Sequence, residues 1–127
     1  EATGATLGKN EGQGRSKYRN VKTVVGSLVF DSKAEADYWM GLQARERAGE
    51  IENLQRQVRL PLLAPNRTVV AENAAYLVVA HYVADFYYET VADGAAHIVD
   101  KKGKRTQMYL LKRKWLELQD GIVIEEV

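Results

Sequence analysis

Two strand-like runs on either side of an Asp-Gly pair constrain the fold of this chain more than any other feature. Apolar and aromatic residues fill residues 76–89, and a second run, residues 95–102, follows directly after Asp93-Gly94. This arrangement predicts an antiparallel hairpin. A four-residue loop places Asp85 opposite Asp100, whereas a two-residue Asp-Gly turn places Asp85 opposite Lys102.

The hairpin gathers acidic and basic side chains at one level of the sheet. Asp100 and Lys102 are two residues apart and therefore share a face of their strand. In either register a cross-strand partner of Asp85 lies with its Cβ roughly 4.5–5.5 Å away. Both Asp85 and Asp100 follow apolar neighbours, and buried carboxylates are costly unless a cation or hydrogen bonds compensate them. The pattern favours a metal site, and an ordinary cross-strand ion pair is the alternative.

The predicted chemistry is the hydrolysis of a phosphodiester. Mg²⁺ prefers oxygen ligands and keeps several waters, so the carboxylates of Asp85 and Asp100 are sufficient ligands. The main-chain carbonyl of Lys101 is a further candidate ligand. A metal held there neutralises phosphate oxygens and lowers the pKa of a bound water. Lys102 is positioned to orient that water or to contact the scissile phosphate.

The remaining pattern predicts one domain of the α/β class, with a mixed sheet flanked by helices. Residues 1–16 are small and polar and predict a flexible arm before a domain over residues 17–127. The expected elements are a hairpin over residues 23–30, a helix from Ser32 to about Ala48, one or two strands over residues 51–63, extended runs over residues 68–72, 76–89 and 95–102, a helix from Thr106 to about Gln119, and a last strand over residues 122–127.

Local signals set the ends and the faces of the two helices. Ser32 and Glu35 form a capping box, and Gly49 ends the first helix. Its predicted buried stripe comprises Ala34, Tyr38, Leu42 and Arg45, with Trp39 beside it. The predicted buried stripe of the second helix comprises Met108, Leu111, Trp115 and Leu118.

Composition excludes several classes of site. The 127 residues include no cysteine, which excludes disulfides, thiolate zinc sites and cysteine nucleophiles, and suits the cytoplasm. There is no signal-peptide pattern and no apolar run long enough for a membrane helix, so we expect a soluble protein. The net charge is +1, yet basic residues cluster over residues 101–114 and near the N-terminus. Such clusters attract a phosphate backbone, although a solvated helix face is the simpler interpretation of either one alone.

The acidic strands, in their order and spacing, resemble the PD-(D/E)XK signature of the restriction-endonuclease-like nucleases. The resemblance runs from Lys17 to Val127, and is closest to a small phage and prophage family of that superfamily, long catalogued as a domain of unknown function. Holliday-junction resolvases and transposon end-cleaving nucleases belong to the same superfamily. The segments that carry the resemblance are residues 30–36, 48–57, 82–86, 99–103 and 106–114, followed by Gly121-Ile122.

The resemblance implies roles for further residues. Glu35 matches an acidic residue that completes the metal site or its surroundings, and its other role is in the capping box. Gln57 matches a glutamine beside the active site, and is otherwise a polar strand residue. Residues implied to contact DNA are Lys101, Lys104, Arg105, Lys112, Lys114, Arg15, Lys17 and Arg19. A solvated lysine remains the alternative for Lys112, and His97 is expected to be a structural or surface histidine.

The expected function is that of a Mg²⁺-dependent DNA endonuclease, with Mn²⁺ as a substitute. The resemblance implies a phage or prophage protein that acts in the bacterial cytoplasm on branched or duplex DNA, as a homodimer. Three positions depart from the family pattern: Ala84 replaces proline, Val99 stands where an acidic residue is common, and Lys101 where an apolar one is common. Fewer carboxylates weaken metal affinity, so a catalytically degenerate DNA-binding protein is the second hypothesis. A phage structural protein with an accidental pair of acids is the third.

Overall fold

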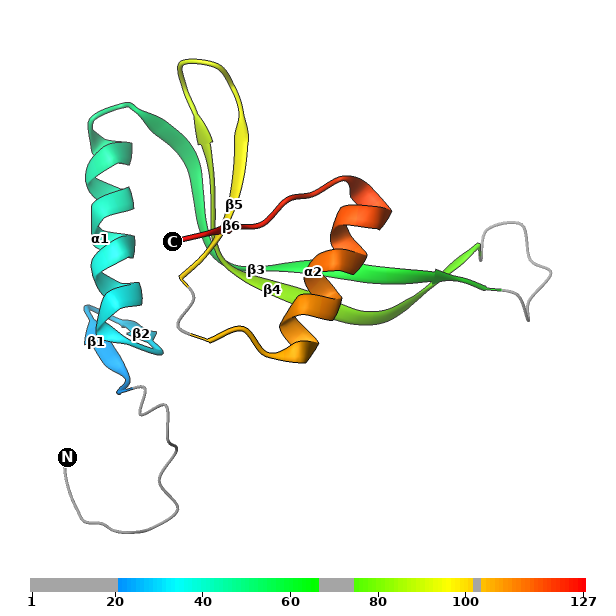
Figure 1. Ribbon diagram of the computed structural model, residues 1–127. Coiled ribbons are helices and arrows are strands. Elements are labelled where there is room, and N and C mark those ends of the chain that lie inside the picture. Colours follow the sequence, from blue (N-terminus) through cyan, green and yellow to red (C-terminus); the bar gives the residue numbers. More distant parts are fainter. Residues whose placement is uncertain (1–20, 67–74, 102–103) are drawn as a thin grey trace, which may run out of the picture. The chain divides into compact units, whose positions relative to one another are not determined.

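The computed structural model describes residues 21–66, 75–101 and 104–127. Its elements, labelled in Figure 1, are β1 (Thr23–Val25), β2 (Leu28–Phe30), α1 (Lys33–Arg47), β3 (Ile51–Pro65), β4 (Tyr76–Thr90), β5 (Ala96–Asp100), α2 (Gln107–Asp120) and β6 (Glu125–Glu126). The chain is therefore a mixture of α and β, as predicted. It divides into two compact units, of which the first ends at Asp37 and the second begins at Tyr38. The predicted arm over residues 1–16 and the extended run over residues 68–72 lie outside the described residues.

The first unit contains the β1–β2 hairpin and the start of α1. Thr23 pairs with Phe30 and Val25 with Leu28, so the predicted hairpin is confirmed. Ser32 Oγ accepts a hydrogen bond from the Glu35 amide at 3.1 Å, which confirms the first half of the capping box. The Glu35 carboxylate accepts from the amide of Asp31 at 3.0 Å, one residue before the expected Ser32 amide. Glu35 thus helps to fix the chain where it enters α1.

The second unit is built on a four-stranded sheet in the order β3-β4-β5-β6. The first three strands are antiparallel, and β6 pairs with β5 in parallel, so the sheet is mixed as predicted. Residues 51–65 form one long strand that runs through Pro61. Proline lacks an amide donor, and β3 tolerates it because, among the described strands, it lies at the edge of the sheet.

The β4–β5 hairpin has the register of the four-residue loop. Phe86 pairs with Val99 and Glu89 with Ala96, and the Thr90 amide donates to the Ala95 carbonyl at 2.9 Å. Gly94 supplies the positive φ of +70° that the loop requires. The alternative two-residue Asp-Gly turn, which would place Asp85 opposite Lys102, is therefore excluded.

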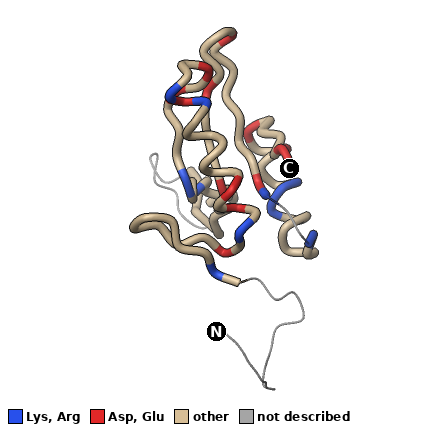
Figure 2. Tube along the Cα trace, turned by 90° about the vertical axis from the view of Figure 1, so that its left-hand side faces the viewer, with Lys and Arg blue, Asp and Glu red and all other residues tan. Residues whose placement is uncertain are grey.

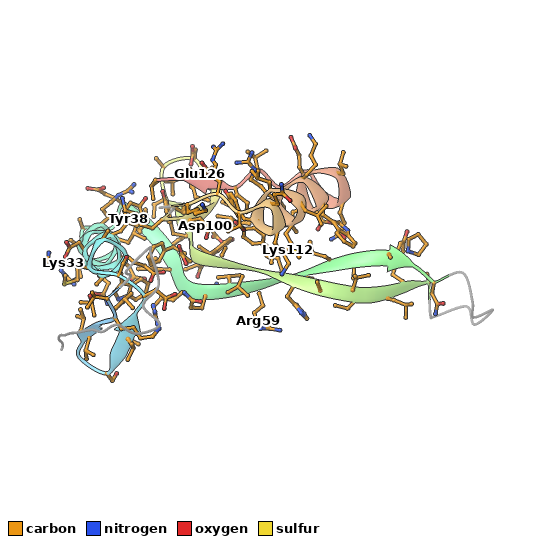
Figure 3. The ribbon with its side chains drawn as sticks, turned by 60° about the horizontal axis from the view of Figure 1, so that its bottom comes forward. Lys33, Tyr38, Arg59, Asp100, Lys112 and Glu126 are labelled. Carbon is orange, nitrogen blue, oxygen red and sulfur yellow. The ribbon has the colours of Figure 1, made fainter. Side chains whose placement is uncertain are left out.

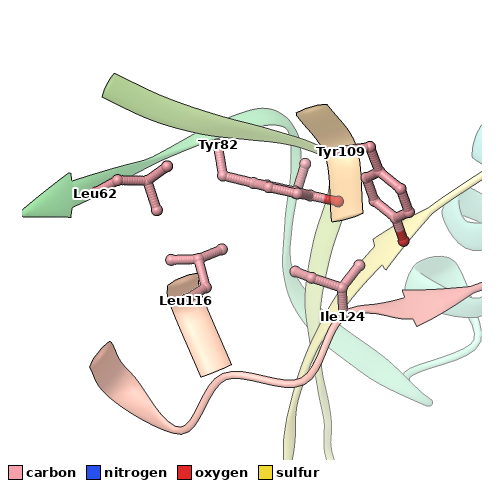
Figure 4. Packing of buried hydrophobic residues seen from close by; sticks show 6 residues of the cluster. Leu62, Tyr82, Tyr109, Leu116 and Ile124 are labelled. Carbon is pink, nitrogen blue, oxygen red and sulfur yellow. The ribbon is translucent and has the colours of Figure 1, made fainter. Parts of the chain in front are cut away.

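The main core of the second unit lies between the sheet and α2. Leu62 and Tyr82 from the sheet pack against Tyr109 and Leu116 of α2 and against Ile124 (Figure 4). Thr106 caps α2, because its side chain accepts from the Tyr109 amide at 3.0 Å. At the other end of the sheet, Trp39 of α1 stacks on Phe86 with ring centroids 6.0 Å apart.

Both predicted helix stripes need correction. In α2, Met108, Leu111 and Leu118 are exposed, while Tyr109 and Leu116 are buried. The Tyr109 hydroxyl bonds to Glu126 and the Lys112 ammonium to the His81 carbonyl, and these long-range contacts favour another rotation of the helix than apolar spacing alone predicts.

In α1, Ala34 is exposed, and the buried side chains are those of Glu35, Ala36, Trp39 and Leu42. The aromatic pair Trp39 and Phe86 sets this face, because burying two large rings contributes more than burying a methyl group. The charged residues of α1 lie toward its two ends, with acidic Glu35 in the first turn and basic Arg45 and Arg47 in the last (Figure 2).

Candidate functional site

Asp85 and Asp100 meet where β4 and β5 part. Register pairing between the strands ends at Phe86 and Val99, one step before the two acids. Beyond this pair, the main-chain amides of the two strands donate to aspartate carboxylates instead of main-chain carbonyls. The Asp85 amide donates to Asp100 Oδ1 at 2.9 Å, and the Lys101 amide donates to Asp85 Oδ2 at 2.9 Å. These reciprocal bonds make the two acids neighbours in one fixed arrangement, which we call the acidic fork.

Asp100 is the buried member of the acidic fork. It is 0 % exposed, and its Oδ2 accepts a hydrogen bond from the hydroxyl of Tyr82, which lies in the core. Regular alternation from buried Val99 would direct Asp100 away from the core. The side chain turns inward because β5 ends here, and the Tyr82 hydroxyl and the Asp85 amide supply donors that compensate its burial. The Asp100 carbonyl also accepts from the Val127 amide at 2.9 Å, which ties it to the end of the chain.

Asp85 is the more accessible member. It is half-buried and lies between Ala84 and Phe86, which are both 0 % exposed and occupy the other face of β4. Its Oδ2 accepts the Lys101 amide, and no described residue hydrogen-bonds to its Oδ1. Within the described part of the chain, Oδ1 is therefore the one oxygen of Asp85 without a hydrogen-bond partner.

Gln57 on β3 completes a row across three strands. Its neighbours Arg56 and Val58 pair with Phe86 and Ala84, so Gln57 lies opposite Asp85. The side chain is exposed, and the backbone has a φ of +52°. A left-handed conformation at a non-glycine residue costs about 1–3 kcal/mol and is found preferentially at functional sites. The predicted place of Gln57 beside the acids thus coincides with local backbone strain.

A second polar cluster lies next to Asp100 in the sheet. Glu126 on β6 is the register partner of Asp100, and it binds Arg105 at 2.6 Å and Arg113 at 2.7 Å. It also accepts from the Tyr109 hydroxyl. The hydrogen bond from Arg105 holds the pKa of Glu126 below its usual value, and burial raises the pKa of Tyr109 to about 12. We call this the Glu126 cluster, and Figure 3 shows Glu126 and Asp100 on the same side of the β3–β4 ribbon.

Sequence reasoning misses the Glu126 cluster and the role of Tyr82. It places Glu126 only in a terminal strand, and Tyr82 only among the core aromatics. Both contacts join segments far apart in the chain, and no local pattern marks them. The single available signal is that Tyr82, buried in a strand, needs a partner for its hydroxyl.

The residues predicted to contact DNA have several different environments. The Arg105 guanidinium binds Glu126, and the Lys112 ammonium donates to the His81 carbonyl at 2.9 Å. Lys114 is exposed and pairs with Glu117 at 3.1 Å. Lys101 is half-buried, and Lys104 is exposed. Arg15, Lys17 and Arg19, together with the predicted catalytic Lys102, lie outside the described residues.

The predicted metal ligands are brought together only in part. Asp85 and Asp100 are adjacent, and carboxylate oxygens are the chemistry that Mg²⁺ prefers. Glu35 is 4 % exposed and belongs to the first unit, so its place in the site stays a prediction. Within residues 21–66, 75–101 and 104–127, no group of three His, Cys, Asp or Glu residues forms a metal centre.

His97 has a structural environment, as expected. It binds Glu125 at 2.7 Å and stacks on Tyr88 with centroids 4.8 Å apart.

One family model matches the chain, over residues 15–123, and its description is "Protein of unknown function (DUF1064)". The chain belongs to this family. The DUF1064 match spans the acidic fork, Gln57 and α2. Neither a curated protein nor a solved structure matches the chain significantly. Among the described helices, none is long and apolar enough to cross a membrane.

Proposed function

We propose that this DUF1064 protein is a metal-dependent DNA endonuclease whose active site is the acidic fork. The observation that supports this most is the pair of reciprocal hydrogen bonds between Asp85, Asp100 and Lys101. They hold two carboxylates side by side at the end of a strand, and no described residue hydrogen-bonds to Oδ1 of Asp85. The resemblance of both acidic strands to the PD-(D/E)XK signature points to the same residues.

Each residue of the proposed site has a separate role. Asp85 and Asp100 would hold Mg²⁺ or Mn²⁺, with the Lys101 carbonyl and Glu35 as further candidate ligands. The bound cation would supply charge neutralisation and a water of lowered pKa. Lys102 follows in sequence to orient the water or to contact the scissile phosphate. Gln57, which lies opposite Asp85, would fix the water or a substrate group by hydrogen bonds.

The proposed substrate is DNA, either branched or duplex. The basic stretch over residues 101–114 follows directly after the acidic fork and contains seven Lys or Arg residues and no acid. Such a stretch provides the electrostatic attraction for a phosphate backbone next to the acids. The resemblance to Holliday-junction resolvases makes a four-way junction the first substrate to test. It also underlies the proposals of a homodimer and of a phage or prophage protein in the bacterial cytoplasm.

A second candidate function is DNA binding without cleavage. Both carboxylate oxygens of Asp100 already accept hydrogen bonds from the protein, which is the pattern of a structural carboxylate. In this case the protein would bind DNA with a steep salt dependence and leave it intact.

The test is cleavage of four DNA forms by the purified protein: supercoiled plasmid, linear duplex, single strand and four-way junction. Each is incubated with Mg²⁺, with Mn²⁺ and with EDTA. The proposal requires nicking or junction cutting that depends on the metal. Salt-dependent binding of the same DNAs without any cleavage would favour the second candidate.

Asp85→Asn is the variant that separates catalysis from folding most cleanly. The new side-chain amide oxygen can still accept the hydrogen bond from the Lys101 amide. Asp100→Asn is less suitable, because both oxygens of the fully buried Asp100 accept hydrogen bonds, and an amide nitrogen would then face either the Asp85 amide or the Tyr82 hydroxyl. A lost ligand that contributes several kcal/mol should lower the cleavage rate by at least about 100-fold. Asp120→Asn, the same change at an exposed position at the end of α2, should cleave at the wild-type rate.

A further inference from the structure

Arg59 on β3 carries a positive charge that is fixed in place but not neutralised. The residue is exposed, and its guanidinium donates a hydrogen bond to Nδ1 of His81 on β4 at 3.2 Å. No described carboxylate pairs with Arg59, whereas Arg45 and Arg105 each bind a glutamate. A guanidinium has five N–H groups, so most of the donors of Arg59 remain for a ligand.

The contact with Arg59 determines the tautomer of His81. A guanidinium can only donate hydrogen bonds, so Nδ1 must accept, and the imidazole proton lies on Nε2. None of the described residues hydrogen-bonds to this Nε2. The two side chains, which we call the Arg59–His81 pair, therefore present hydrogen-bond donors only. Such a surface is complementary to an anion whose oxygens only accept, such as a phosphate.

A second cation fixes the main chain of His81. The Lys112 ammonium donates to the His81 carbonyl at 2.9 Å, and the other two of its three hydrogens are left over. Figure 3 shows Lys112 on the α2 side of the β3–β4 ribbon and Arg59 on the opposite side. Two positive groups therefore meet at one residue of β4.

The Arg59–His81 pair lies on the same face of the ribbon as Asp85. Val83, which pairs with Arg59, and His81 precede Asp85 in β4 by two and four residues, and side chains at this spacing share a face. With a rise of about 3.3 Å per residue, the pair lies roughly 7–13 Å from Asp85 along the strand. The phosphates of one DNA strand follow each other about every 3.4 Å along the axis, so this distance corresponds to about two to four nucleotides.

The part of the ribbon around the Arg59–His81 pair contains no negative charge. Residues 57–65 and 75–84 include no Asp or Glu, and Arg59 and His81 are their only basic residues. A phosphate bound to the pair would therefore not be repelled by a carboxylate of these two segments.

We propose that the Arg59–His81 pair is a phosphate contact that holds the DNA backbone about two to four nucleotides from the acidic fork. Arg59 binds a phosphate oxygen through its remaining N–H groups, and Nε2 of His81 donates to the same phosphate. The inference rests on the proposed DNA substrate, and it adds a face of the ribbon outside the basic stretch over residues 101–114. The contact positions the backbone and reads no base, so it acts equally on all sequences.

The test is binding of the full chain, in EDTA and at several salt concentrations, to a four-way junction and to two duplexes of unrelated sequence. EDTA separates binding from cleavage. Arg59→Gln should weaken binding to each DNA by about 10-fold or more and should lower the slope of log affinity against log salt by about 1. Arg47→Gln removes the same charge from an exposed position on α1 and should bind like the wild type.

His81→Asn tests the second half of the Arg59–His81 pair. The asparagine keeps an oxygen acceptor for Arg59 and removes the Nε2 donor. It should therefore weaken DNA binding, yet leave the salt slope nearly unchanged, because no charge is lost. Wild-type DNA affinity in this variant would overturn the role of His81. Circular dichroism spectra that match the wild type would show that both variants are folded.

The outcomes separate this proposal from the endonuclease. Equal DNA affinity of Arg59→Gln and the wild type, or equal losses in Arg59→Gln and Arg47→Gln, would overturn the phosphate contact even if the wild type cleaves DNA. A loss confined to one sequence would also overturn it, since that result indicates a base contact. An Arg59-dependent affinity without any cleavage in Mg²⁺ or Mn²⁺ would support the contact and contradict the endonuclease. A wild type that binds none of these DNAs would overturn both.

Discussion

The hydrogen bond from Tyr82 to Asp100 allows a quantitative test of how the acidic fork is held. Tyr82→Phe removes one hydroxyl from a residue that is 3 % exposed and leaves Asp100, at 0 %, without that donor. A hydrogen bond to a charged group contributes about 1.5–3 kcal/mol. The free energy of unfolding should fall by that amount, since the ring remains and leaves almost no cavity.

Urea denaturation followed by circular dichroism measures this change. With a denaturant slope of about 1–3 kcal/mol/M, the midpoint should fall by roughly 1 M, with the slope unchanged. The matched control is Tyr87→Phe on the same strand, because the Tyr87 hydroxyl donates at 2.5 Å to Glu89, which is only half-buried. This control should change stability by no more than about 0.5 kcal/mol.

The partner assignment is tested by repeating Tyr82→Phe in an Asp100→Asn background. In this background the Tyr82 hydroxyl no longer bonds to a charged acceptor. The loss of unfolding free energy caused by Tyr82→Phe should therefore be smaller than in the wild type by about 1 kcal/mol or more. Equal losses in the two backgrounds, or a Tyr82→Phe protein as stable as the Tyr87→Phe control, would refute the contact between Tyr82 and Asp100.

Three further predictions concern the surroundings of the acidic fork. Gln57→Gly should lower the cleavage rate yet keep or raise the free energy of unfolding, because glycine adopts a positive φ without strain. Arg59→Gly, a control in the same strand, should lower the free energy of unfolding by about 1 kcal/mol. Equal losses of stability for the two variants in urea denaturation would contradict this prediction. The pKa of Glu126 is lowered chiefly by Arg105, so its contribution to stability is present above the usual value of 4.5 and is lost as the pH falls below it. The melting temperature should therefore fall as the pH is lowered from about 6 to 3, and Arg105→Gln should make this fall smaller. The pKa of Tyr109 is raised to about 12, so ultraviolet titration should show phenol ionisation that is still incomplete at about pH 11, with stability lost as the pH rises from 10 to 12. Complete ionisation by about pH 11 would disprove this prediction.

Turns, caps and strand pairing were predictable from sequence because their causes are local. Asp93-Gly94 set a short loop, and the loop fixed Phe86 against Val99 and so placed Asp85 beside Asp100. Thr106 and Ser32 marked the beginnings of the two helices through their own side-chain hydrogen bonds. The mixed sheet followed from the order of these elements.

What the sequence did not predict depends on contacts between distant segments. The rotation of α2 is set by partners on other elements, so Met108, Leu111 and Leu118 of the predicted stripe are exposed, whereas Trp115 packs against the core. Asp100 turns inward to a hydroxyl 18 positions earlier, against the alternation of its own strand. The positive φ of Gln57 is equally invisible in a polar strand residue.

The central claim is that the acidic fork binds a divalent cation, and direct Mn²⁺ binding measures it most plainly. Titration of the wild type, by calorimetry or by loss of the free Mn²⁺ electron paramagnetic resonance signal, should show one site that Mg²⁺ displaces. Asp85→Asn should abolish this site, and Asp120→Asn should retain it. Equal Mn²⁺ binding by both variants, or none by the wild type, would contradict the account.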